Sequence, residues 1–125
     1  MAIKSNVDKE KDLTTYVLSG EISADDLMKA LKSFFSGDLS SNVLWDLREA
    51  EFGGGIPSND LKEMAVYSKK KQPEKARGKI AIVASSDLGF GMSRIFEVYA
   101  ELEGVKNPVQ VYRSMKKAMK WLEEE

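Results

Sequence analysis

The sequence contains neither cysteine nor histidine, and these two absences exclude several classes of function. Without cysteine the chain cannot form a disulfide, a thiolate nucleophile, or a cysteine-ligated zinc or iron–sulfur centre. Without histidine it lacks the commonest metal ligand and the one side chain whose ordinary pKa lies near neutrality. Ser–His and Cys–His catalytic pairs therefore cannot form. We expect a protein that is not an enzyme and that uses no cofactor or metal.

Long apolar runs are also missing. No stretch approaches the roughly 20 apolar residues that cross a bilayer, and the first twelve residues carry charges of both signs instead of an apolar signal segment. We therefore expect a cytoplasmic protein without stable membrane insertion. The net charge is −1, from 19 basic and 20 acidic side chains. Because duplex binding depends on many Lys/Arg–phosphate contacts, this balance argues against nucleic acid as a partner.

The composition that is present is that of an ordinary globular domain. The chain has 125 residues, of which 42% are hydrophobic and 31% are charged, and it contains no repeat or Pro/Ser-rich linker. That length is the commonest one for a single domain and is sufficient for one hydrophobic core. We expect a single domain over residues 1–125.

The apolar pattern predicts five strands and four helices in the order ββαβαβαβα. Strands are expected at residues 3–7, 13–18, 43–47, 79–84 and 109–112, and the first two should form a hairpin. Alternating strands and helices imply parallel pairing through right-handed crossovers. The expected fold class is α/β, with a five-stranded mixed, mostly parallel sheet whose first strand is antiparallel at one edge.

Helix starts are expected at Ser23, at Pro57–Ser58, at Ser86–Asp87 and after Ser114. The four expected inward faces are Leu27, Leu31 and Phe34; Leu61, Met64, Ala65 and Ser68; Met92, Ile95, Tyr99 and Leu102, with Phe96 beside them; and Met115, Ala118, Met119 and Leu122. Trp121 lies off the last of these faces, which makes it a candidate contact in a homodimer.

Two segments carry a resemblance to a known family: residues 42–48 (NVLWDLR) and residues 79–97 (KIAIVASSDLGFGMSRIFE). With the order ββαβαβαβα, they make the chain similar to the SpoIIAA-like (STAS) fold of anti-sigma factor antagonists. The closer resemblance is to a bacterial SpoIIAA-like, STAS/CRAL-TRIO-like branch of uncharacterised function. In anti-sigma factor antagonists the loop after the third strand holds a phosphorylatable serine in an Asp-Ser-Ser-Gly-like context. Residues 51–58 lack that motif, and Ser58 lies near its place without matching it.

The segment after the expected strand 79–84 is the first candidate binding site. Ligands of open α/β sheets gather at the carboxyl ends of the strands, and the segment carries Ser85, Asp87, Gly89, Gly91 and Arg94 there. N–H groups at a helix start, with Arg94 one turn inside, would suit an anion. The structural alternative is that Asp87 caps the helix while the glycines permit close contact between helix and sheet.

The loop from Phe52 to Pro57 is the second candidate, because it contains Gly53, Gly54 and Gly55 in succession. Such a loop suits a mobile lid or a nest of amides around an anion, or it is simply a connection whose glycines satisfy turn geometry. Both loops follow parallel strands, so we expect one pocket with Trp45, Phe52 and Phe90 as walls and Arg94 as polar anchor. The candidate ligand-binding residues are therefore Trp45, Asp46, Phe52, Gly53, Gly54, Gly55, Ser58, Ser85, Asp87, Gly89, Phe90, Gly91 and Arg94.

Two charged groups have a simpler interpretation than function. Asp46 and Arg48 are candidates for catalysis in principle, but a surface ion pair is the more usual role of such a pair. The basic residues Lys69–Lys71, Lys75, Arg77 and Lys79 could contact phosphate groups, but lysines also suit the negative end of a helix dipole.

Two functions follow from these observations. The first is a regulatory protein–protein interaction module that binds its partner through the loop edge or a helix face. The alternative is a carrier or sensor of a small lipophilic or anionic ligand, with its pocket at the carboxyl edge of the sheet; the lipophilic ligands of the related CRAL-TRIO fold imply this second expectation.

Overall fold

The computed structural model describes residues 2–37, 40–73 and 78–124. Its helices and strands follow the predicted order, with these bounds: β1 (Ala2–Asp8), β2 (Leu13–Glu21), α1 (Ala24–Ser36), β3 (Asn42–Glu51), α2 (Ser58–Lys71), β4 (Ile80–Val83), α3 (Asp87–Glu103), β5 (Val109–Tyr112) and α4 (Met115–Glu123).

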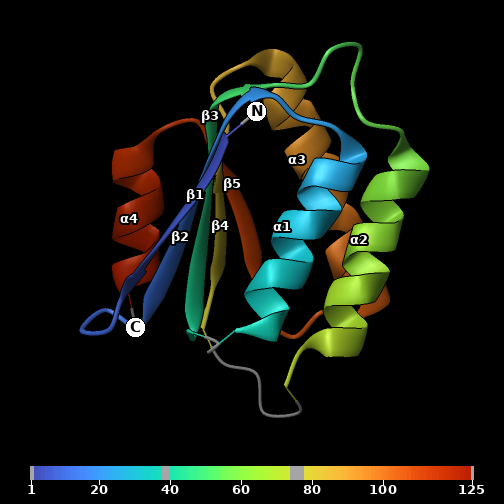
Figure 1. Cartoon of the computed structure of the whole chain (residues 1–125). Helices are drawn as coiled ribbons and strands as arrows, with labels where there is room; N and C mark the ends of the chain where they lie inside the picture. The colour runs from blue at the N-terminus through green and yellow to red at the C-terminus, as the bar shows by residue number, and fades with distance from the viewer. Residues whose placement is uncertain (1, 38–39, 74–77, 125) are drawn as a thin grey trace.

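The five strands form one sheet in the spatial order β1-β2-β3-β4-β5. The β1–β2 pair is antiparallel, and every other neighbouring pair is parallel. Helices α1, α2 and α3 cover one face of the sheet, and α4 covers the other (Figure 1). The predicted fold class and the antiparallel edge strand are therefore confirmed.

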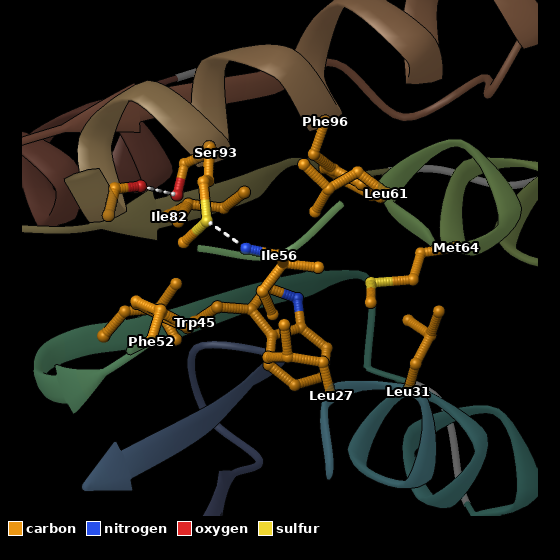
Figure 2. Close-up of a pocket in the computed structure, with 13 residues that line it drawn as sticks. Leu27, Leu31, Trp45, Phe52, Ile56, Leu61, Met64, Ile82, Ser93 and Phe96 are labelled. Carbon is orange, nitrogen blue, oxygen red and sulfur yellow. Dashed lines mark hydrogen bonds between the residues drawn. The ribbon is translucent and has the colours of Figure 1, made fainter. Parts of the chain in front are cut away.

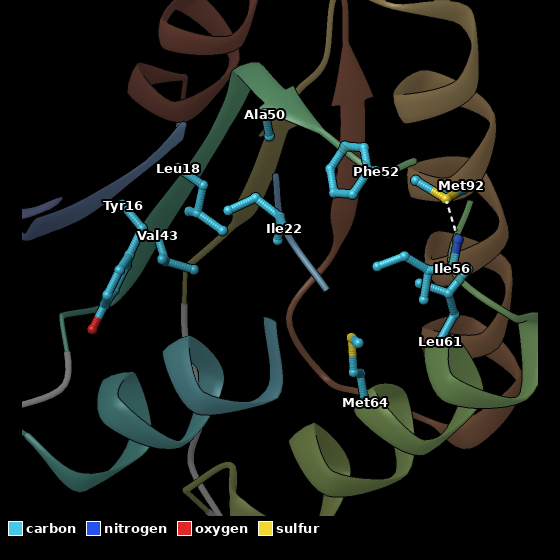
Figure 3. Close-up of a cluster of buried hydrophobic side chains, with 10 residues drawn as sticks. All are labelled: Tyr16, Leu18, Ile22, Val43, Ala50, Phe52, Ile56, Leu61, Met64 and Met92. Atoms are coloured by element: carbon cyan, nitrogen blue, oxygen red, sulfur yellow. Dashed lines mark hydrogen bonds between the residues drawn. The ribbon is translucent and has the colours of Figure 1, made fainter. Parts of the chain in front are cut away.

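The side chains of β4 show how both faces of the sheet are buried. Ala81 and Val83 pack in a cluster with Ala118 and Leu122 of α4, while Ile82 between them packs on the opposite face. A nearly continuous apolar strand is what such two-sided cover requires. On the face of α1–α3, a larger cluster joins β2, β3, the β3–α2 loop, α2 and α3 (Figure 3).

Serine side chains cap three helices. Ser23 and Asp26 form a capping box at α1, and the Ser114 hydroxyl accepts the Lys117 N–H at α4. At α3 the cap is Ser86, whose Oγ accepts the Gly89 N–H at 3.0 Å. The expectation that Asp87 caps this helix is therefore wrong by one residue. Asp87 is the first helical residue instead, where a carboxylate interacts favourably with the helix dipole.

The predicted inward face of α3 is only partly right. Met92 is buried, but Ile95 is 41% exposed and Leu102 is 74% exposed. The buried residues of the helix are Gly89, Met92, Ser93 and Ala100. Phe96 and Tyr99 are partly buried against the core, as predicted, whereas Ile95 and Leu102 lie on the outer face of the helix. The other helices match expectation more closely: Leu61, Met64, Ala65 and Ser68 of α2 are all buried.

Trp121 packs within its own chain rather than projecting from it. Its ring lies 6.0 Å from the Tyr112 ring between centroids, and the Lys79 ammonium lies 5.2 Å from its centroid. This half-buried side chain therefore has a packing role at the end of α4, which weakens the reason for expecting a dimer contact there.

Candidate functional site

The two loops that the sequence singled out meet at the carboxyl edge of the sheet. The Ile56 N–H lies 3.0 Å from the Met92 sulfur, which joins the β3–α2 loop to α3. A methyl group at Gly89 would lie 3.4 Å from the Phe52 ring. Gly89 therefore permits the close approach of α3 to this loop. The structural alternative, in which both glycines permit close contact of the helix, does not hold for Gly91, where a methyl group would meet no atom within 4 Å.

An apolar cavity of about 80 Å³ lies beneath the loops (Figure 2). Side chains from α1, β3, α2, β4 and α3 line it, together with Phe52 and Ile56 of the β3–α2 loop. Its polar lining residue, Ser93, donates its hydroxyl to the Gly89 carbonyl at 2.8 Å. The lining of the site is otherwise hydrocarbon and aromatic surface, to which Trp45 adds its indole ring and N–H group.

Two of the three expected walls reach this cavity, and the expected polar anchor does not. Trp45 and Phe52 line it, together with Gly89 from the wider set of candidate residues. Arg94 lies on the exposed face of α3, where it forms an ion pair with Glu97 at 3.2 Å. Phe90 lies under the Arg113 guanidinium, whose carbon is 4.4 Å from the ring centroid. The cavity therefore forms without the expected polar anchor and without one of its expected walls.

The volume of the cavity limits what it can hold. A water molecule takes about 30 Å³ in the liquid, and an engineered cavity that binds benzene measures about 150 Å³. At about 80 Å³ the cavity of this chain is smaller than the benzene-binding cavity. Phe52 and Ile56, 7% and 8% exposed, would have to move for a larger ligand to enter. Among the described residues, every buried polar side-chain atom also has a hydrogen-bond partner.

The glycines of the β3–α2 loop serve its turn. The backbone φ angles of Gly53 and Gly55 are +58° and +109°, which favour glycine. The Gly55 N–H donates to the Phe52 carbonyl at 2.8 Å. This turn returns the chain so that Phe52 and Ile56 both point inward, while Gly53 and Gly54 are exposed at its tip.

Asp46 and Arg48 form a structural pair at a β-bulge on β3. Val17 of β2 pairs with Asp46 of β3, and Ser19 pairs with Glu49. One residue of β2 and two residues of β3 lie between these pairs, so β3 has one extra residue there. The Asp46 carboxylate accepts the Arg48 backbone N–H at 3.1 Å and two guanidinium hydrogen bonds at 2.9 Å each. The guanidinium hydrogen bonds to Asp46, and then the charge of that carboxylate, raise the pKa of Arg48. The Asp46 side chain is only 8% exposed, so the expected surface ion pair is in fact half-buried.

Arg113 organises the outer part of this edge and was missed by sequence reasoning. It donates to the Ser85 carbonyl at 3.3 Å, pairs with Asp87 at 2.9 Å, and covers Phe90. The Ser85 hydroxyl in turn donates to the Arg48 carbonyl at 3.2 Å. Arg113 directly follows the last strand, so its position at this edge was available as a signal.

The residues of the expected basic cluster occupy separate places in the structure and have different contacts. Lys69, Lys70 and Lys71 occupy the last turn of α2, as the helix-dipole interpretation predicts. Lys75 and Arg77 lie outside the described residues. Lys79 donates to the carbonyl groups of Trp121 and Glu124 at the end of α4, so it stabilises that helix end.

A groove between α1 and α2 is a second candidate surface, which sequence reasoning missed. It encloses about 410 Å³ and is lined by Met28, Lys32, Asn59, Lys62, Glu63, Val66, Tyr67 and Lys70. Two ammonium groups, those of Lys32 and Lys71, each lie 5.9 Å from the Tyr67 ring centroid. The outward positions of Val66, Lys62 and Lys70 on α2 were the available signal.

Three solved structures are similar to this chain over nearly all of its length. An anti-sigma factor antagonist from Mycobacterium paratuberculosis has 18% identity and a TM-score of 0.59, covering 98% of this chain and 96% of that one. The anti-sigma factor antagonist SpoIIAA, in its unphosphorylated form, has 12% identity and a TM-score of 0.58, covering 96% and 95%. The chain has a SpoIIAA-like fold.

The third structure with the SpoIIAA-like fold is an uncharacterized protein of the DUF3478 family from Shewanella loihica PV-4. It has 14% identity and a TM-score of 0.57, covering 97% of this chain and 92% of that one. No family model matches the sequence, and no curated protein is similar to it. At these identities the likeness establishes the fold, and function has to be argued from the surfaces of this chain.

Ser58 is the first residue of α2, and its hydroxyl lies 2.7 Å from the Tyr99 hydroxyl. No group of three or more carboxylates suited to a metal ion occurs in the described part of the chain. Across the same residues, no helix has the length and hydropathy of a membrane span.

Proposed function

We propose that the chain is a non-enzymatic regulatory module that binds an acidic, partly apolar segment of a partner protein in the groove between α1 and α2. The observation that carries this proposal is the combination of an open groove of about 410 Å³ with a lysine-rich rim. Its volume falls within the usual range of binding clefts, about 300–1,000 Å³.

The chemistry of the groove favours an acidic ligand with apolar side chains. Met28, Val66 and Tyr67 supply its apolar surface, and the Val66 side chain remains 44% exposed. Lys32, Lys62 and Lys70 lie around that surface, whereas Glu63 is the acidic residue of the lining. A partner segment with carboxylates beside leucine or phenylalanine would complement both features.

Two further observations support a protein partner over a small ligand. The cavity at the carboxyl edge measures about 80 Å³ and would have to open before it could hold a lipophilic ligand. Two of the similar structures are anti-sigma factor antagonists, and their names describe action on another protein. The carrier or sensor function, with the candidate residues of that edge as its site, is the alternative that the experiment below must exclude.

The test is affinity capture from the cells that naturally make the protein, followed by titration of the captured partner. The test variant is Lys62→Glu/Lys70→Glu, which reverses two charges in the groove. The matched control is Lys116→Glu/Lys120→Glu, which makes the same charge change on exposed positions of α4.

We expect the wild type and the control to retain the same partner protein, and the groove variant to bind it at least about tenfold more weakly, equivalent to 1.4 kcal/mol. Equal affinity of the groove variant, or no retained protein, would contradict the proposal. A small molecule that co-purifies in stoichiometric amount would favour the carrier instead.

A further inference from the structure

The outer face of α3 carries an apolar stripe that nothing in the described chain covers. Leu88, Ile95, Val98 and Leu102 are 44%, 41%, 52% and 74% exposed. With the exposed Gly91, they follow the spacing i, i+3, i+7, i+10, i+14 along the helix. That spacing is the seam of a two-helix coiled coil, in which the first and fourth positions of each heptad face a second helix.

The glycine in this stripe is not required by the fold. A methyl group at Gly91 would meet no atom within 4 Å, whereas one at Gly89 would lie 3.0 Å from the Ser86 Oγ. Glycine is unfavourable inside a helix. Because the monomer has room for a larger side chain at this position, we attribute the glycine to a contact with a second molecule. A glycine in a helical seam allows a second helix to approach closely.

We propose that two copies of this chain associate through α3, with the two helices antiparallel. In an antiparallel seam, first positions of the heptad pack against fourth positions of the other helix. Ile95 then lies opposite the partner's Val98. In the same register Leu102, which is 74% exposed, lies over the partner's Gly91, where no side chain opposes it.

Charges beside the stripe fit the antiparallel orientation. Arg94 and Glu101 are exposed, lie one heptad apart, and flank the same side of the seam. In the antiparallel register, Arg94 comes next to the partner's Glu101, and the symmetry axis repeats this pair. A parallel register would bring Arg94 beside the partner's Tyr99 and leave the charges unmatched. The intrachain contact of Arg94 with Glu97, at 3.2 Å, involves an exposed guanidinium that can reorient.

The size of the contact sets the expected strength of the association. A 17-residue helix is about 25 Å long at 1.5 Å per residue. One such contact belongs to the small class of interfaces, which is typical of weak dimers. With a net charge of −1 on each chain, general repulsion between the copies is small. We therefore expect a dissociation constant in the micromolar range.

The experiment is sedimentation equilibrium of the purified full chain from about 1 to 500 µM, a range that brackets a micromolar constant. The wild type should pass from monomer to dimer, and Ile95→Asp should remain monomeric. Arg94→Glu and Glu101→Arg alone should each weaken the dimer about fivefold or more. The double variant Arg94→Glu/Glu101→Arg should restore it, because it re-creates the pair with its charges exchanged. Circular dichroism checks that each variant is folded.

Val66→Asp is the matched control, since Val66 is a similarly exposed apolar residue on α2. It should leave the dimer unchanged while weakening partner binding in the groove, so the two proposals fail separately. A wild type that stays monomeric throughout, or an Ile95→Asp variant that dimerises equally well, would overturn association through α3. Failure of the double charge exchange to restore the dimer would overturn the antiparallel register.

Discussion

Arg48 binds the carboxylate of Asp46, two residues earlier on β3, through Nε and Nη2 at 2.9 Å each and through its backbone N–H at 3.1 Å. The pair lies where β3 bulges against β2. A bulge leaves backbone groups without their ladder partners, and here the carboxylate supplies the missing acceptor. Asp46, which the sequence suggested as a candidate for catalysis or ligand binding, therefore has a structural role.

The first prediction concerns this pair. Asp46→Ala should lower the free energy of unfolding by about 2–3 kcal/mol, because it removes all three hydrogen bonds from a buried position. Asp46→Asn keeps an acceptor for the Arg48 N–H and should lose only about 1 kcal/mol. Urea unfolding measures both changes. Two variants as stable as the wild type would show that the bulge does not depend on this side chain.

The two glycines of α3 should respond in opposite directions to alanine. Gly89→Ala brings a methyl group to 3.0 Å from the Ser86 Oγ and 3.4 Å from the Phe52 ring, and should destabilise the fold by about 1–2 kcal/mol. Gly91→Ala finds open space and should stabilise the monomer by about 0.5–1 kcal/mol. Thermal or urea unfolding at low protein concentration tests this difference; the same sign for both variants would contradict the described packing.

Enlarging the apolar cavity should create a ligand site that the wild type lacks. Phe52→Ala removes a lining side chain that is 7% exposed and should cost about 3–5 kcal/mol of stability. Benzene should then raise the unfolding midpoint of the variant but not that of the wild type, because the wild-type cavity of about 80 Å³ is below the roughly 150 Å³ that holds benzene. An equal effect of benzene on the wild type would indicate a cavity that opens readily.

The capping box of α1 should make stability depend on acid pH. The Ser23 backbone N–H and then its hydroxyl hold the pKa of Asp26 below its ordinary value of 3.8. A pKa lowered on folding contributes stability that is fully present above the unfolded pKa and is lost as the pH falls through the folded pKa. NMR titration should find the pKa below 3.8 in the wild type, and Ser23→Ala should raise it part-way, since the backbone donor remains. An Asp26 pKa at or above 3.8 in the wild type would contradict the capping geometry.

The order of strands and helices was predictable because their signals are local. The apolar run of β4, the capping serines before α1 and α4, and the alternation of β5 each fix one element without knowledge of the rest. The β3 strand was predicted too short, at residues 43–47 instead of 42–51. The bulge interrupts the alternation of its side chains, so the pattern of buried and exposed residues changes in mid-strand.

The outer face of α3 was assigned to the core because apolar spacing alone does not say which stripe faces inward. Ile95 and Leu102 form one stripe, while Met92, Phe96 and Ala100 form another. The inner face also carries Gly89 and Ser93, which look unsuited to a core until the close approach of α3 to the loop is known. Tertiary packing decides between two such stripes, and a single sequence does not contain that information.

The candidate site was predicted in outline and not in detail. The two loops meet as expected, because parallel strands end at the same edge of a sheet. Whether Arg94 faces the cavity depends on the rotation of α3, and the same rotation that buries Ser93 places Arg94 outside. The α1–α2 groove depends on how two helices that follow different strands lie beside each other, which no local pattern specifies.

The central claim is that this chain binds a protein rather than carrying a small molecule, and native mass spectrometry of the protein freshly purified from its own cells tests it most directly. We expect masses of the 14.0 kDa chain and its protein complexes, with no additional small component. A stoichiometric mass increment of a few hundred daltons on the wild type, absent after filling the cavity by Ser93→Leu, would contradict it.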